Sequence, residues 1–169
     1  MWATIALLYN TKLTNVPLGS LFERLTRMSS FDDVRRIALS LPEVVEEEKA
    51  CRFAVMDAEK GRTTFHKQSF VWPWMERVNP KKPRVARFDI VVIKVADMSE
   101  KQLLLAADHD KFFPDPHYDG FPAVSVRLPE IEIDELTELI TDAWRSVAPS
   151  SLLEDYEAVS PSAPHDLSL

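Results

Sequence analysis

Two stretches of the chain repeat apolar residues at the spacing of an amphipathic helix. Residues 31–41 place them one turn apart until Pro42 ends the run, and Ser30 is suited to cap this helix. Residues 134–147 show the same period over a longer helix, which we expect Asp134 to cap and Pro149 to end. The apolar positions of the second helix are Leu136, Leu139, Ile140, Ala143, Trp144 and Val147.

Between these helices, apolar and polar residues alternate with the period of two that is typical of β-strands. Residues 52–56 and 62–66 flank a turn at Gly61, and together they predict a hairpin. Residues 68–75 are rich in aromatic side chains and form the next predicted strand. Because proline cannot donate to a strand ladder, Pro73 is expected to confine this strand to a sheet edge or to a strand end.

Three further elements complete the pattern. Residues 88–95 are apolar on both alternating sets of positions, which predicts a central strand covered on both faces. Residues 99–102 form a capping box at the start of a short helix, whose apolar face is Leu103, Leu104 and Ala107. Residues 124–128 alternate as in a half-exposed strand.

The order of elements is helix, a run of strands, helix, strand and helix. Strands grouped in this way favour an antiparallel sheet over repeated βαβ crossovers. We therefore predict an α+β fold, a two-layer sandwich with helices packed on one face of an antiparallel sheet. Residues 29–158 form this single domain, residues 1–28 an N-terminal appendage with little periodicity, and residues 159–169 a flexible Ser/Pro-rich tail.

Composition excludes several classes of function. The 169 residues include three glycines, far apart in the sequence, so no loop resembles a Walker or Rossmann phosphate site. Cys51 is the single cysteine, which rules out an internal disulfide and a Cys-rich zinc site, and we expect it to be buried and inert at a strand start. With no apolar run of membrane-spanning length and no signal-like start, we expect a cytoplasmic protein.

Charge is distributed unevenly along the chain. The net charge is −7, yet residues 76–87 carry +4, so the other residues together carry −11. Prolines within this basic segment stiffen it and reduce the entropy lost when its cations are ordered against phosphates. The alternative interpretation is a solvated loop beside buried tryptophans. The candidate nucleic-acid-binding residues are Arg77, Lys81, Lys82, Arg84 and Arg87.

A second candidate site is the polar loop at residues 108–120. It holds six Asp and His side chains within twelve residues, and Asp115, His117 and Asp119 would lie on one side of an extended segment. The spacing matches no established metal motif, and aspartate and proline are ordinary turn residues. We therefore predict no metal site, no cofactor and no catalytic residue, and ordinary turn chemistry is the favoured interpretation.

Several segments together resemble the MmcQ/YjbR-like proteins over residues 29–150. They include DVRRIALSLPEV, ERVNPKKPRV, DKFFPDPHYDG and the closing DAWR-x-x-AP. The resemblance implies a two-layer domain similar to secretion-chaperone-like and frataxin-like folds. It also implies DNA binding, with hairpins acting as two wings.

These observations lead to one favoured function and two alternatives. The favoured one is a DNA-binding or regulatory protein that binds phosphates of double-stranded DNA weakly and without sequence preference through the basic segment. The first alternative is a small-ligand or metal-binding protein, with an enzyme included, that uses the loop at 108–119. The second is a protein–protein interaction module, and the chain acts as a monomer or a homodimer.

Overall fold

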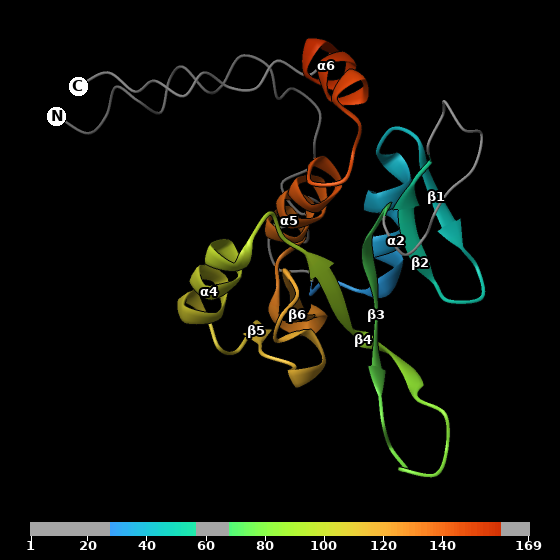
Figure 1. Cartoon of the computed structure of the whole chain (residues 1–169), viewed down its shortest axis with the longest axis vertical. Coiled ribbons are helices and arrows are strands. Elements are labelled where there is room, and N and C mark those ends of the chain that lie inside the picture. The colour runs from blue at the N-terminus through green and yellow to red at the C-terminus, as the bar shows by residue number, and fades with distance from the viewer. Residues whose placement is uncertain (1–27, 57–67, 160–169) are drawn as a thin grey trace, which may run out of the picture.

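The computed structural model describes residues 28–56 and 68–159. Within them, six strands form one antiparallel sheet in the order β1-β2-β3-β4-β6-β5 (Figure 1). This arrangement confirms the predicted α+β class and the central position of the strand at 88–95. The strands are β1 (Val44–Glu47), β2 (Arg52–Val55), β3 (Ser69–Glu76), β4 (Val85–Lys94), β5 (Phe112–Phe113) and β6 (Ala123–Arg127).

Two helices cover one face of the sheet and build the core with it. These two helices, α2 and α5, contact each other. Helix α2 also contacts β1, β2 and β4, and α5 contacts β3 and β4. Helix α4 contacts β5 and β6 instead. The fully buried side chains between these layers include Phe53, Ile93 and Trp144. The helices are α2 (Phe31–Ser40), α4 (Met98–Ala107), α5 (Ile133–Arg145) and α6 (Ser150–Val159), with short 3₁₀ turns η1 (Pro116–Tyr118) and η2 (Leu128–Glu130).

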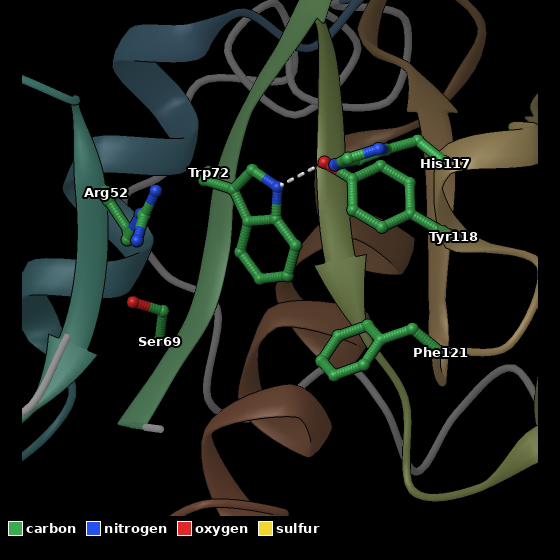
Figure 2. Close-up of a pocket in the computed structure, with 6 residues that line it drawn as sticks. All are labelled: Arg52, Ser69, Trp72, His117, Tyr118 and Phe121. Carbon is green, nitrogen blue, oxygen red and sulfur yellow. Dashed lines mark hydrogen bonds between the residues drawn. The ribbon is translucent and has the colours of Figure 1, made fainter. Parts of the chain in front are cut away.

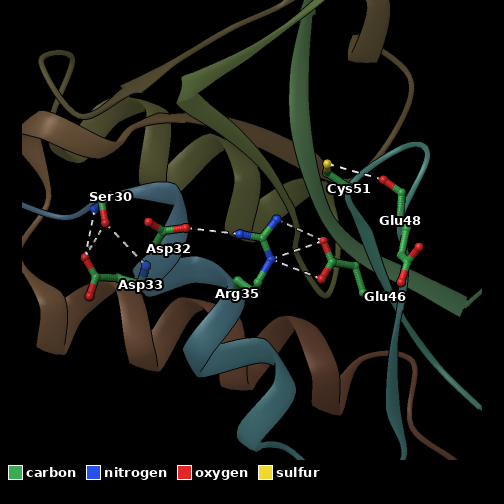
Figure 3. A network of polar contacts seen from close by, with 7 residues as sticks. All are labelled: Ser30, Asp32, Asp33, Arg35, Glu46, Glu48 and Cys51. Atoms are coloured by element: carbon green, nitrogen blue, oxygen red, sulfur yellow. Dashed lines mark hydrogen bonds and ion pairs between the residues drawn. The ribbon is translucent and has the colours of Figure 1, made fainter.

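Helix α2 begins at the predicted cap. The Ser30 hydroxyl accepts a hydrogen bond from the Asp33 N–H, and the Asp33 carboxylate accepts one from the Ser30 N–H, so the two residues form a capping box (Figure 3). At the fifth residue of the helix, the Arg35 guanidinium donates to Glu46 of β1 at 3.1 Å. This contact fixes α2 against the edge of the sheet, and Glu46 raises the pKa of Arg35.

Helix α5 carries the centre of the core, as predicted. Leu136, Ile140, Ala143 and Trp144 are buried against the sheet. The expected cap is wrong, because the helix begins at Ile133 and its cap residue Glu132 makes no side-chain capping bond. Asp134 lies instead in the first turn, where the helix dipole favours a carboxylate.

Helix α6 was not expected from the sequence. It follows Pro149, and the ring of Tyr156 stands edge-on to Trp144 with centroids 4.8 Å apart. Leu152 and Leu153 also pack against the core. The helix therefore covers the indole that α5 directs into the core.

The expectation that Pro73 lies on an edge strand or at a strand end is wrong. Its strand, β3, lies third in the sheet, between β2 and β4, and is neither an edge nor ended by the proline. Pro73 is opposite Val91 but Trp74 is opposite Arg87, so residues 88–90 of β4 bulge out of the register. Because the ladder is interrupted beside Pro73, its missing N–H is tolerated in the sheet interior.

Helix α4 differs from its prediction in both start and orientation. Its cap is Asp97, whose carboxylate accepts from the N–H groups of Ser99 and Glu100, so the predicted box at 99–102 is wrong. Leu103, expected on the apolar face, is 70% exposed, whereas Lys101 is 3% exposed. The helix presents a lysine to the protein interior, which apolar periodicity alone does not indicate.

Two other strand predictions need correction. Strand β6 is not half-exposed, because Ser125 is buried together with its apolar neighbours. Strand β2 pairs with β1 and β3, while the predicted hairpin partner at 62–66 lies outside the described residues. Cys51, which precedes β2, is half-buried rather than buried, and its backbone adopts a positive φ of 48°.

In the part of the chain that the structure describes, no helix is long and apolar enough to cross a membrane. The predicted appendage and tail fall almost wholly on residues 1–27 and 160–169, outside the described residues. The domain boundaries therefore stay predictions.

We expect Trp144→Ala to lower the free energy of unfolding by about 3–5 kcal/mol, as is typical when a large buried aromatic side chain is truncated. Trp144 is fully buried and its indole N–H donates to the Pro42 carbonyl at 3.1 Å. Denaturant titration measures the loss. Leu103→Ala, at an exposed position on α4, is the control and should change stability by less than about 0.5 kcal/mol. A Trp144→Ala loss as small as that of the control would contradict the described core.

Candidate functional site

The basic segment forms the end of a long hairpin, residues 76–87, which we call the basic hairpin. Strands β3 and β4 pair as far as Glu76 and Val85, and the turn between them is closed by a hydrogen bond from the Lys82 N–H to the Asn79 carbonyl. Residues 77–85 are all exposed. The hairpin projects beyond the rest of the sheet (Figure 1).

The five predicted cations of this hairpin fall into two groups. Arg87 donates to Glu76 at 3.0 Å and to Asp89 at 2.6 Å, and it holds the pKa of the Asp89 carboxyl below its usual range. The other four make no ion pair within the described residues, and two of them donate only to backbone carbonyls. These unneutralised cations are Arg77, Lys81, Lys82 and Arg84.

A loop covers part of the second face of the sheet, opposite the face that α2 and α5 cover. Trp72 is in register with Val92, which is opposite Ser125, so all three side chains point away from the core that α2 and α5 build. Residues 115–121, which we call the aromatic loop, lie over this face (Figure 2). Val92 and Ser125, on this second face, are buried.

Both tryptophans of β3 bind the aromatic loop through their indole N–H groups. Trp72 donates to the Tyr118 hydroxyl at 2.9 Å, and Trp74 donates to the Asp115 carboxylate at 2.5 Å. The other carboxylate oxygen of Asp115 accepts from the His117 N–H at 2.8 Å and so caps the 3₁₀ turn. Aspartate and tryptophan thus fix the shape of the loop and its position together.

A buried lysine holds the end of the same loop. The ammonium group of Lys101 donates to the carbonyl of Tyr118 and, at 3.1 Å, to the carbonyl of Phe121. Lys101 makes no ion pair within the described residues, so these two carbonyls compensate for the burial of its charge. A lysine in the sequence gives no signal of this role, because lysine is mostly a surface residue.

Between the aromatic loop and strands β2 and β3 lies a pocket of about 410 Å³. Figure 2 shows the Tyr118 ring facing Trp72, with Arg52 and Ser69 on the other side of the indole. Burial raises the pKa of the Tyr118 hydroxyl. The lining residues are Arg52, Ser69, Trp72, His117, Tyr118 and Phe121.

The structure does not arrange Asp115, His117 and Asp119 as a row of ligands. Residues 116–118 form a 3₁₀ turn, so the segment is not extended as the metal interpretation required. Asp115 is engaged by Trp74 and by the loop backbone. Across residues 28–56 and 68–159, no three His, Cys, Asp or Glu side chains gather in a group that could hold a metal ion.

Comparisons with known proteins find relatives in mycobacteria and a fold neighbour in Deinococcus. The proteins Rv2570 of Mycobacterium tuberculosis and Mb2600 of Mycobacterium bovis, both described as uncharacterized, are 37% identical to the chain over 142 residues. That match spans 79% of the chain and 99% of each relative. The crystal structure of Deinococcus radiodurans DR2400, described as a DUF419 domain, superimposes with a TM-score of 0.51 at 18% identity, over 86% of the chain and 99% of DR2400, and shows a shared fold. No protein-family model matches the chain.

We expect Lys101→Met to destabilise the protein by about 1–3 kcal/mol, because the carbonyls of Tyr118 and Phe121 lose the donor that a buried lysine supplies. The substitution should also speed up amide hydrogen exchange, and this increase should be larger in the aromatic loop than elsewhere in the chain. Lys81→Met, at an exposed position on the basic hairpin, is the control and should change neither quantity. Unaltered exchange in the loop of the Lys101 variant would show that the lysine does not hold it.

Proposed function

We propose a nucleic-acid-binding function for this chain, which belongs to the same family as the mycobacterial proteins Rv2570 and Mb2600. The observation that supports the proposal is the basic hairpin. It projects from the sheet and presents four cations without carboxylate partners among the described residues: Arg77, Lys81, Lys82 and Arg84. A projecting strand pair with such a tip can follow a phosphate backbone without bringing the rest of the domain into contact.

The basic hairpin can attract a polyanion because it extends away from the acidic rest of the domain. The other residues carry −11, and their repulsion of a polyanion is screened over about 8 Å at physiological salt. A hairpin that extends past the domain places its cations where local attraction outweighs that repulsion. Arg87, at the base of the hairpin, already has two carboxylate partners and contributes less to phosphate binding.

We propose that binding to double-stranded DNA is weak and independent of sequence. The hairpin tip offers lysine and arginine for phosphates but no helix carrying Asn, Gln and Arg toward base edges. The protein would act in the cytoplasm, as a monomer or homodimer, with residues 29–158 as its domain. The resemblance to the MmcQ/YjbR-like proteins, which implies DNA binding, agrees with this proposal.

We assign the chain to the MmcQ/YjbR-like group as part of the same proposal. The motifs that carry the resemblance include DKFFPDPHYDG, and the structure gives its residues definite roles. Asp115 accepts from Trp74, and Tyr118 accepts from Trp72. A motif whose residues fix the loop to the sheet is expected to mark a shared fold.

Titration of binding with salt tests the proposed function. Four phosphate contacts predict a slope of about −3.6 for log K against log salt, from roughly −0.9 per phosphate. Replacing Lys81, Lys82 and Arg84 together by alanine should flatten the slope to about −0.9. Fluorescence anisotropy with a labelled DNA duplex, beginning at low salt, measures both values.

A matched triple variant separates the hairpin from net charge. Replacing Arg36, Lys49 and Arg145 by alanine removes the same three charges from exposed positions outside the hairpin. It should leave the slope near that of the unaltered chain. Equal slopes for the two triple variants, or no binding at low salt, would rule out the hairpin as a DNA-binding element.

A further inference from the structure

We infer that the pocket beside the aromatic loop binds a small molecule that carries a planar aromatic ring and an anionic group. The inference goes beyond the proposed DNA binding, because it uses a separate set of residues on the second face of the sheet. Its volume of about 410 Å³ suits one ring system with its substituents and lies within the range of about 300–1,000 Å³ typical of ligand pockets.

Arg52 indicates the anionic group. Its Nε has no hydrogen-bond acceptor among the described residues, and the Glu47 carboxylate lies 3.9 Å from it, beyond hydrogen-bond distance. Nε itself is buried, but the Arg52 side chain is 27% exposed and lines the pocket, so an acceptor in the pocket would bond to the guanidinium through its terminal nitrogens. A carboxylate or phosphate meets the requirement best, because its bonds to a guanidinium are charge-assisted.

Three aromatic side chains indicate the planar ring. The Trp72 centroid lies 6.0 Å from that of Tyr118 and 6.5 Å from that of Phe121, with the ring planes tilted by 58° and 53°. Rings at these distances and tilts pack directly against one another, so together they form one aromatic wall of the pocket, on which a planar ligand ring can stack. Phe121 is 42% exposed, so part of its surface remains open to a ligand.

The Tyr118 hydroxyl adds a hydrogen-bond donor beside the aromatic wall of the pocket. The Tyr118 oxygen accepts the indole N–H of Trp72, which leaves its own O–H available to donate. Burial raises the pKa of Tyr118 and outweighs the lowering by the Trp72 hydrogen bond and by the charges of Arg84 and Arg52, so the hydroxyl keeps its proton. The two arginines make the local potential more positive than the net charge of the chain suggests.

The walls are fixed before any ligand enters. Trp72 is tied to Tyr118, and Lys101 holds the carbonyls of Tyr118 and Phe121. Little conformational entropy is therefore lost on binding, which favours affinity for a small ligand.

Calorimetry on the full chain with four probes tests the inference. Adenosine 5′-monophosphate and indole-3-acetate each combine a ring with an anion, whereas adenosine lacks the anion and inorganic phosphate lacks the ring. At least one of the first two probes should bind with a Kd below about 1 mM. Its affinity should be about tenfold or more higher than that of adenosine or inorganic phosphate, which each carry only one of the two features. The stronger of the two identifies a phosphate or a carboxylate as the preferred anion.

Variants then locate the binding. Arg52→Gln should weaken the stronger probe about tenfold or more, while Arg36→Gln, at an exposed position on α2, should not. Phe121→Ala should also weaken it, with Phe88→Ala, 48% exposed on β4, as the aromatic control. Melting temperature confirms that each variant is folded.

Three outcomes would overturn the inference. They are Kd values above about 1 mM for both two-feature probes, equal affinity in Arg52→Gln, and loss of binding in a double variant with Lys81 and Lys82 replaced by alanine. The last would place the probe on the basic hairpin. Because that double variant leaves Arg84 and the pocket residues intact, failure of the pocket and failure of DNA binding are distinguishable.

Discussion

Two indole N–H groups and one buried ammonium group fix the aromatic loop to the second face of the sheet. A sheet with helices on one face leaves the other face open to water, and here Val92 and Ser125 on that face are nevertheless buried. The cover is a short loop, which packs Tyr118 and Phe121 against Trp72 and is positioned by directed hydrogen bonds from Trp72, Trp74 and Lys101. The pocket exists because the loop is held in this place.

Strand β3 joins this pocket to the basic hairpin. Trp72 and Trp74 bind the loop, and two residues later the strand continues into the projecting tip. The bulge beside Pro73 lets the strand remain in the sheet interior while it changes register with β4. One strand therefore supports two surfaces of different chemistry, an aromatic pocket and a row of cations, in a chain that is acidic elsewhere.

The sequence predicts the elements whose pattern is local and not those that depend on a distant partner. The capped helix at Ser30, the central strand and the apolar face of α5 follow from periodicity alone. Strands β1 and β5 are too short for a clear pattern, and the packing of α6 depends on Trp144, a residue of another helix. The prediction that Pro73 confines its strand to an edge is wrong because a bulge in the neighbouring strand compensates for the missing N–H. No local pattern in the sequence indicates that bulge. The basic hairpin could be identified from charge, whereas the pocket could not, because Arg52, Trp72 and Phe121 are far apart in sequence.

Exchange of the indole N–H protons of Trp72 and Trp74 with solvent tests most directly whether these hydrogen bonds hold the loop. Two-dimensional NMR of the ¹⁵N-labelled chain resolves indole signals, and Trp72→Phe and Trp74→Phe assign them. Both protons should exchange at least about tenfold more slowly than the indole of free tryptophan, because each must leave its acceptor first. Exchange of both at the rate of free tryptophan would contradict the central role given to these bonds.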